Sequence, residues 1–153
     1  MEPELVHATA IVIGSTGLLL VGPSGSGKST KALQLMSTAR RAAHFAALVS
    51  DDQVFLEIRN DRVIATAPAT IRGKIEVRGT GIAAIPSIDL AELNYVVRLE
   101  FINASNRIPN DDAIWTSAGG ISLPLITLDR STPDPYAVLE AFLPGFPVLT
   151  PNS

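Results

Sequence analysis

The residues best suited to chemistry stand in one glycine-rich segment near the N-terminus. Residues 22–30 satisfy the pattern G-x-x-x-x-G-K-[ST]. Glycines allow successive backbone N–H groups to point inward, and the start of a following helix adds free N–H donors. Lys28 could then reach the β- and γ-phosphates, and the Ser29 hydroxyl could bind Mg²⁺. This segment predicts a phosphate-binding loop for a nucleoside triphosphate, formed by Gly22, Pro23, Ser24, Gly25, Ser26, Gly27, Lys28, Ser29 and Thr30.

A pair of acids follows the next apolar run. Asp51 and Asp52 come directly after residues 45–50, which are predicted to end a buried strand. The carboxyl ends of strands face the ligand crevice in α/β sheets, so one acid could hold Mg²⁺ and the other could deprotonate an attacking hydroxyl. Asp-Asp pairs are also common in ordinary turns. The pattern alone leaves both interpretations open.

These groups need strands and a helix to position them. Apolar residues recur at three- and four-residue spacing after the loop, which predicts a helix from Ser29 to about Ala43. A second, short helix is predicted over Tyr136–Leu143. The loop Asn103–Asp112 is predicted to be a mobile surface loop, and the tail Pro144–Ser153 to be poorly ordered. Short apolar runs predict strands at Thr9–Ile13, Leu18–Val21, Phe45–Val49, Val54–Ile58, Val63–Ala67, Tyr95–Phe101 and Ile121–Leu128.

Composition excludes several classes of function. The chain has 153 residues, of which 46% are hydrophobic, so residues 1–153 are expected to form one domain with a real core. A net charge of −3 argues against binding nucleic acid or anionic membrane. Without cysteine there is no thiolate zinc site and no cysteine nucleophile. The acidic N-terminus is unlike a signal peptide and no apolar run could span a membrane, so a cytoplasmic protein is expected.

Over residues 5 to 143 the chain resembles the catalytic domain of bacterial HPr kinase/phosphorylase, in a short form without the N-terminal regulatory domain. His7 precedes Gly22 by fifteen residues, as in that family, and Asp51-Asp52 follow a hydrophobic strand. Residues 76–82 look like the family signature of Glu, an aliphatic residue, Arg-Gly, any residue and Gly-Ile. Arg107 lies where the family carries a catalytic loop arginine. The signature and the His7 spacing make the resemblance specific.

The resemblance implies a fold and an activity. The fold would be α/β, a P-loop kinase domain with a mixed β-sheet core and few helices, like phosphoenolpyruvate carboxykinase. Family members use ATP and Mg²⁺ to phosphorylate a serine of HPr, a small phosphocarrier of the sugar phosphotransferase system. Many also reverse the reaction by phosphorolysis. The family forms hexamers in which neighbouring subunits help to bind HPr.

The resemblance also implies a role for each matching residue. Asp51 would be the base that accepts the serine proton, and Lys28 would stabilise the transferring phosphoryl group. His7 would lie beside the Asp51 carboxylate, and Arg107 would neutralise charge. The metal would be held by Ser29, Asp52 and Glu76. Without the family, Glu76 and Arg78 could simply form an ion pair at a strand edge, and His44 and Trp115 would have structural roles.

Other functions for a phosphate-binding loop stay in view. A small-molecule or nucleotide kinase would carry an arginine-rich lid, and only 12 Lys and Arg residues are present. A transporter ATPase needs a Leu-Ser-Gly-Gly-Gln type signature and a GTP switch needs Asn-Lys-x-Asp, and neither occurs. Nucleotide use with and without HPr separates a kinase from a non-transferring ATPase or nucleotide switch.

Overall fold

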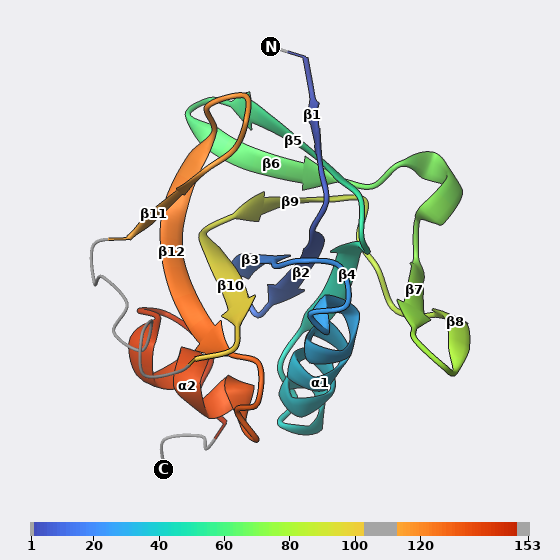
Figure 1. Cartoon of the computed structure of the whole chain (residues 1–153), viewed down its shortest axis with the longest axis vertical. Helices are drawn as coiled ribbons and strands as arrows, with labels where there is room; N and C mark the ends of the chain where they lie inside the picture. Colours follow the sequence, from blue (N-terminus) through green and yellow to red (C-terminus); the bar gives the residue numbers. More distant parts are fainter. Residues whose placement is uncertain (1, 103–112, 150–153) are drawn as a thin grey trace.

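The computed structural model describes residues 2–102 and 113–149, which form three layers (Figure 1). Helices α1 (Lys28–Arg41) and α2 (Pro135–Phe142) pack on one face of a six-stranded sheet. A four-stranded sheet covers the opposite face. The small hairpin of β7 (Lys74–Val77) and β8 (Gly81–Ala84) projects beside α1.

The central sheet has the order β11-β12-β10-β3-β2-β4. Strands β3, β10 and β12 run parallel, whereas β2 is antiparallel to both β3 and β4. The carboxyl ends of β3, β4, β10 and β12 therefore meet at one edge of the sheet. The strand bounds are β2 Thr9–Ile13, β3 Thr16–Val21, β4 Ala46–Ser50, β10 Tyr95–Glu100, β11 Ile114–Thr116 and β12 Ser122–Asp129.

The second sheet is antiparallel throughout, in the order β1-β5-β6-β9. Asn60 and Asp61 connect β5 to β6 with φ angles of 51° and 63°, as expected for a tight hairpin turn. A short 3₁₀ helix, η1 (Ala69–Ile71), leads from β6 toward β7. The strand bounds are β1 Glu4–Val6, β5 Val54–Arg59, β6 Arg62–Thr66 and β9 Leu90–Leu93.

Alternation along the central strands feeds two separate cores. In β3, Leu18 and Leu20 pack toward the helices, while Leu19 and Val21 pack toward the second sheet. A sheet covered on both faces needs apolar residues at every position, which explains the unbroken apolar runs in its sequence. Helix α1 contributes one stripe to the first core, formed by Ala32, Leu35, Met36 and Ala39.

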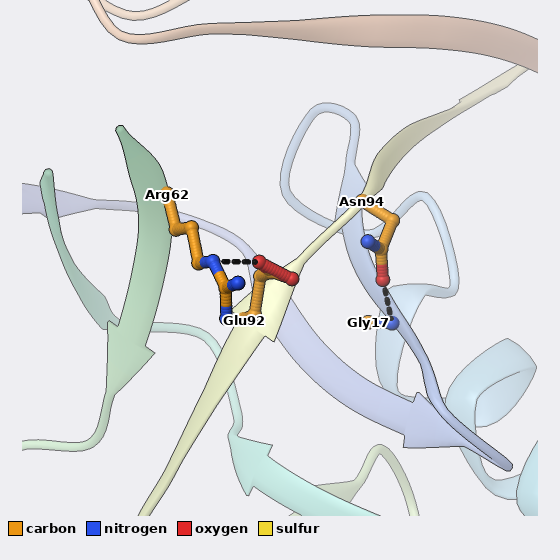
Figure 2. Close-up of polar contacts among 4 residues, drawn as sticks. All are labelled: Gly17, Arg62, Glu92 and Asn94. Carbon is orange, nitrogen blue, oxygen red and sulfur yellow. Dashed lines mark hydrogen bonds and ion pairs between the residues drawn. The ribbon is translucent and has the colours of Figure 1, made fainter. Parts of the chain in front are cut away.

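The two sheets are joined where β9 leads into β10, at Asn94 (Figure 2). The Asn94 Oδ1 atom accepts a 2.7 Å hydrogen bond from the Gly17 N–H, and the Asn94 N–H donates to the Gly17 carbonyl at 2.8 Å. A Cβ atom at Gly17 would lie 1.9 Å from the Glu92 carbonyl oxygen. Only glycine fits at this crossing of the backbones.

Most predicted elements are confirmed with small shifts of their bounds. The first helix begins at Lys28 and ends at Arg41, where residues 29–43 were predicted. The predictions missed β1, β7, β8, β9 and β11, which are only three or four residues long. Trp115 is partly buried against the second core, in agreement with a packing role.

The expectation of a poorly ordered tail is wrong for residues 144–149. Phe146 is buried and its ring centroid lies 4.9 Å from that of Tyr136. The Tyr136 hydroxyl donates a 2.7 Å hydrogen bond to the Pro147 carbonyl. Nε2 of His44 lies 2.5 Å from the Val148 carbonyl oxygen. Apolar contact with the first core holds the segment despite its prolines, while residues 150–153 lie outside the described range.

The sequence also predicted a mobile loop and no membrane-spanning segment. The predicted mobile loop, residues 103–112, lies outside the described residues, and Arg107 lies within it. Neither helix in the described part of the chain combines the length and apolar character needed to cross a bilayer.

Candidate active site

The predicted phosphate-binding loop connects the carboxyl end of β3 to the start of α1. Gly25 and Gly27 have φ angles of 81° and 88°, in the left-handed region where a side chain is strained. Gly27 is the N-cap of α1, so the first N–H groups of the helix open toward the loop. A nest of N–H groups beside a helix N-terminus attracts anions.

Lys28 is folded against this loop. Its side chain is largely buried, and its Nζ atom donates to the Gly22 carbonyl at 3.0 Å and the Pro23 carbonyl at 3.4 Å. The ammonium group therefore lies at the base of the loop, bonded to neutral carbonyl oxygens. A phosphate entering the loop would offer the same ammonium group a charged acceptor, which is a stronger partner.

Asp51 is the centre of a buried hydrogen-bond network. Its side chain is 6% exposed. Its Oδ1 atom accepts from the Ser29 hydroxyl at 2.6 Å and the Thr9 hydroxyl at 3.0 Å. Its Oδ2 atom accepts from the Glu76 N–H at 2.9 Å. One carboxylate thus joins β2, β7 and the start of α1.

Asp52, although adjacent, has different surroundings. Its side chain is exposed and its φ is 66°. The Asp52 carbonyl accepts from the Ala8 N–H at 3.0 Å, and the Asp52 N–H donates to the Thr9 hydroxyl at 3.4 Å. The turn is therefore fixed to β2 by its backbone, which leaves one carboxylate bonded inside the protein and the next one facing solvent.

Both acids open onto a single cavity of about 420 Å³. The cavity combines N–H donors from the loop with two cations and three carboxylates. Three of the predicted loop residues do not belong to the described lining of this cavity: Gly22, Pro23 and Ser26. The lining comprises Ser24, Gly25, Gly27, Lys28, Ser29, Thr30, Asp51, Asp52, Glu76 and Arg78.

The cavity residues suit a magnesium–nucleotide complex. A hydroxyl and carboxylates supply the oxygen ligands that Mg²⁺ prefers, and Ser29, Asp51, Asp52 and Glu76 bring them to one cavity. Within residues 2–102 and 113–149, no three His, Asp or Glu side chains are grouped closely enough to hold a metal by themselves. In proteins, Mg²⁺ usually keeps several waters and takes further ligands from substrate phosphates.

Arg78 is a second cation at the cavity, and the family resemblance assigned it no role. It lines the cavity from the turn after β7, and its Nη1 atom would lie 3.3 Å from a Cβ atom placed on Gly25. The ion pairs between described residues do not join Arg78 to Glu76. The two side chains lie in the cavity, so the alternative of a simple strand-edge ion pair lacks support.

Sequence reasoning also missed Thr9 and Arg130. Nothing in its local pattern distinguished Thr9, because its partner Asp51 lies 42 residues away. Arg130 follows the end of β12, and its guanidinium donates a 3.0 Å hydrogen bond to the Gly25 carbonyl. A signal for Arg130 was present, since it stands at the carboxyl end of a parallel strand.

His7 and Arg107 remain predictions. His7 is exposed between β1 and β2 and is not among the described residues that line the cavity. It lies next to Ala8, whose N–H bonds the Asp52 carbonyl, so its backbone is close to the acidic turn. Arg107 falls outside the described residues.

Comparison with known proteins gives consistent matches. The family model for the HPr Serine kinase C-terminal domain matches residues 1–117. The HPr kinase/phosphorylase of Clostridium tetani is 32% identical over 108 residues, which are 65% of this chain and 33% of that protein. The enzyme of the same name from Mycoplasmopsis pulmonis is 34% identical over 102 residues, 62% of this chain and 31% of that protein. The chain thus matches about a third of the length of these relatives.

A solved structure has the same fold. The Hpr(Ser) kinase/phosphatase from Coxiella burnetii superposes with a TM-score of 0.71, covering 92% of this chain and 93% of that one, at 24% sequence identity. The predicted fold class is therefore confirmed: an α/β fold with a mixed β-sheet core and few helices.

Proposed function

This chain belongs to the HPr Serine kinase C-terminal domain family, and we propose that it transfers the γ-phosphoryl group of ATP to a serine of the phosphocarrier HPr. The observation that carries the proposal is the cavity that holds Lys28, Ser29 and both acids together. A phosphate cradle alone would serve any nucleotide-binding protein. Carboxylates beside the loop add the means to hold Mg²⁺ and to accept a proton from an alcohol.

In this proposal the loop and its cation stabilise charge. The N–H groups around Gly25 and Gly27 bind the β- and γ-phosphates, and Lys28 leaves the Gly22 and Pro23 carbonyls to contact the transferring group. Arg78, which also lines the cavity, neutralises further charge. Bound Mg²⁺ would supply charge neutralisation at the phosphates, and Ser29 would hold it.

The two acids divide the remaining tasks. The resemblance implied that Asp51 is the base and Asp52 a metal ligand. The hydrogen bonds favour the reverse, because the Asp51 carboxylate already accepts from Ser29, Thr9 and the Glu76 N–H. We therefore propose that Asp51, with Glu76, supports the metal beside Ser29. Asp52, exposed to the cavity, accepts the proton of the attacking serine hydroxyl.

We also propose several properties of the family for this chain. Residues 1–153 are proposed to act as one catalytic domain. Hexameric assembly, a cytoplasmic location, phosphorolysis of phosphorylated HPr, and roles for His7 and Arg107 all follow from the family resemblance. HPr as acceptor follows from the names of the relatives.

The proposal is tested by measuring ATP consumption with Mg²⁺ in the presence and absence of HPr. A kinase consumes ATP only when HPr is added, and an HPr whose acceptor serine is replaced by alanine abolishes the stimulation. Equal ATP hydrolysis with and without HPr would identify a non-transferring ATPase. Transfer to small alcohols or nucleotides, but not to HPr, would identify a small-molecule kinase.

A further inference from the structure

We infer that Arg130 is a positioning residue that fixes the tip of the phosphate-binding loop from outside the cavity. The inference deepens the proposed function and depends on the part of it that assigns polyphosphate binding to the loop. It starts from a contact between segments 105 residues apart in the chain: the Arg130 guanidinium donates a 3.0 Å hydrogen bond to the Gly25 carbonyl oxygen.

The peptide group between Gly25 and Ser26 is held on both sides. Its carbonyl accepts from Arg130, and its N–H donates to the Pro23 carbonyl at 3.0 Å. Gly25 itself has φ 81°, and an unrestrained glycine can adopt many other backbone conformations. Two opposed hydrogen bonds select one orientation of this peptide group, and with it the direction of the N–H groups that follow.

Arg130 is itself held in place. Its guanidinium carbon lies 4.0 Å from the centroid of the Phe101 ring, in a cation–π contact. Just before it, Asp129 accepts hydrogen bonds from the N–H and hydroxyl of Ser131. Residues at the carboxyl ends of β10 and β12 thereby restrain the position of the Arg130 side chain.

The segment after Arg130 is fastened to α1 as well. Lys31 Nζ donates to the Thr132 carbonyl at 3.3 Å, and Gln34 Nε2 donates to the Pro133 carbonyl at 3.3 Å. Since α1 begins directly after the loop, the loop tip and the helix that follows it are both bonded to residues 130–133. Replacing Arg130 should therefore alter the conformation of the loop tip more than that of the helix.

Location separates Arg130 from Lys28 and Arg78. Those two cations line the cavity, whereas Arg130 is not among its described lining residues. When Lys28 turns toward a phosphate, the loop loses the hydrogen bonds from the lysine to Gly22 and Pro23. Arg130 can keep its bond to Gly25 throughout, so it restrains the loop in the step where the lysine releases it.

The test compares the unsubstituted chain of residues 1–153 with Arg130→Ala and Arg130→Lys by equilibrium titration with Mg²⁺–ATP and with inorganic tripolyphosphate. Arg130→Ala should weaken both ligands by about the same factor, roughly tenfold for loss of one charged hydrogen bond. Arg130→Lys should recover part of the affinity, because lysine can reach a carbonyl but lacks the planar, stacking guanidinium. In the kinase assay KM for ATP should rise more than kcat falls.

The matched control is Arg62→Ala, which removes an arginine from the second sheet, where it pairs with Glu92 at 3.3 Å (Figure 2). It should leave both affinities unchanged. Thermal unfolding of each variant shows whether it is folded, and the lysine variant keeps the test decisive if the alanine variant is not.

Three outcomes separate the possibilities. Unchanged affinity for both ligands in the Arg130 variants would overturn the inference. Loss for ATP but not tripolyphosphate would also overturn it, because that pattern assigns Arg130 to the nucleoside instead of the loop. If the Arg130 variants lose affinity for both ligands while the wild type never phosphorylates HPr, the loop role of Arg130 is supported and the proposed acceptor is refuted.

Discussion

The hydroxyl of Ser29 donates a 2.6 Å hydrogen bond to Oδ1 of Asp51, which connects the first turn of α1 to the carboxyl end of β4. Hydroxyl-to-carboxylate bonds of this length are among the stronger ones in proteins, because the acceptor is charged. The bond holds a carboxylate beside the hydroxyl that would bind Mg²⁺ in the proposed function. It is the reason for assigning Asp51 to the metal side of the cavity and Asp52 to the acceptor side.

Replacing each acid by its amide should separate these roles. Asp52→Asn should lower kcat for HPr phosphorylation by roughly 10²- to 10⁴-fold, as expected for loss of a general base. Its affinity for Mg²⁺–ATP should stay close to that of the wild type. Asp51→Asn should instead raise the Mg²⁺ concentration needed for half-maximal rate, because a buried negative charge beside Ser29 is removed.

The two variants are compared by steady-state kinetics over a range of Mg²⁺ concentrations and by titration with Mg²⁺–ATP. If Asp51→Asn loses kcat at saturating Mg²⁺ and Asp52→Asn does not, the division of roles is the reverse, as the family resemblance implied. Ser29→Ala should share the Mg²⁺ dependence of Asp51→Asn.

Lys28→Ala should impair both binding and transfer. The ammonium group is buried at the base of the loop, and the variant leaves the Gly22 and Pro23 carbonyls without their donor. We expect a loss of about 3 kcal/mol in transition-state stabilisation, on the order of a hundredfold in kcat/KM, since one preorganised charge is removed. Kinetics measure it, and Lys74→Ala, an exposed lysine at the start of β7, is the control. Equal losses in the two variants would contradict the assignment.

Gly17→Ala should unfold or severely destabilise the protein without touching the cavity. Its Cβ atom would lie 1.9 Å from the Glu92 carbonyl oxygen, and the three nearest atoms all belong to the backbone of Glu92 and Leu93. Neither strand can yield without breaking the paired hydrogen bonds of Asn94. We expect a loss of about 3 kcal/mol or more in the free energy of unfolding, measured by denaturant titration. Ser15→Ala, at an exposed turn position nearby, should change it by less than about 0.5 kcal/mol.

Stability should depend on Tyr136 in alkaline solution. Burial raises the pKa of the Tyr136 hydroxyl, and the nearby charge of Glu140 raises it further. Because this pKa is higher in the folded state, the protonated hydroxyl stabilises the fold fully at pH values below the unfolded pKa of about 10. That contribution to the free energy of unfolding is lost as pH rises through the folded pKa. The free energy of unfolding of the wild type should therefore fall more steeply above pH ~10 than that of Tyr136→Phe. Parallel pH profiles for the two proteins would contradict this.

The sequence predicted the phosphate-binding loop because its chemistry is local. The glycines, Lys28 and Ser29 are neighbours in the chain, and the adjoining strand and helix show clear periodicity. The acidic pair was found for a similar reason, since it ends a continuous apolar strand. These features are fixed by short-range geometry and by burial of both faces of the central sheet.

The partners of these residues could not be predicted from pattern alone. Asp51 receives its hydrogen bonds from Thr9 and the Glu76 N–H, 42 and 25 residues away. Arg130 reaches Gly25 across 105 residues. Such contacts depend on strand order and register. The burial of Phe146 was missed because composition, rich in proline, was weighed above the apolar residues that reach the first core.

The central claim is tested most directly by incubating the purified chain with γ-labelled ATP, Mg²⁺ and HPr and locating the label. The account predicts label on a serine of HPr, in an amount that follows ATP consumed, and almost none with Lys28→Ala. Label that appears only as free inorganic phosphate, or labelled HPr in equal amounts with Lys28→Ala, would contradict it.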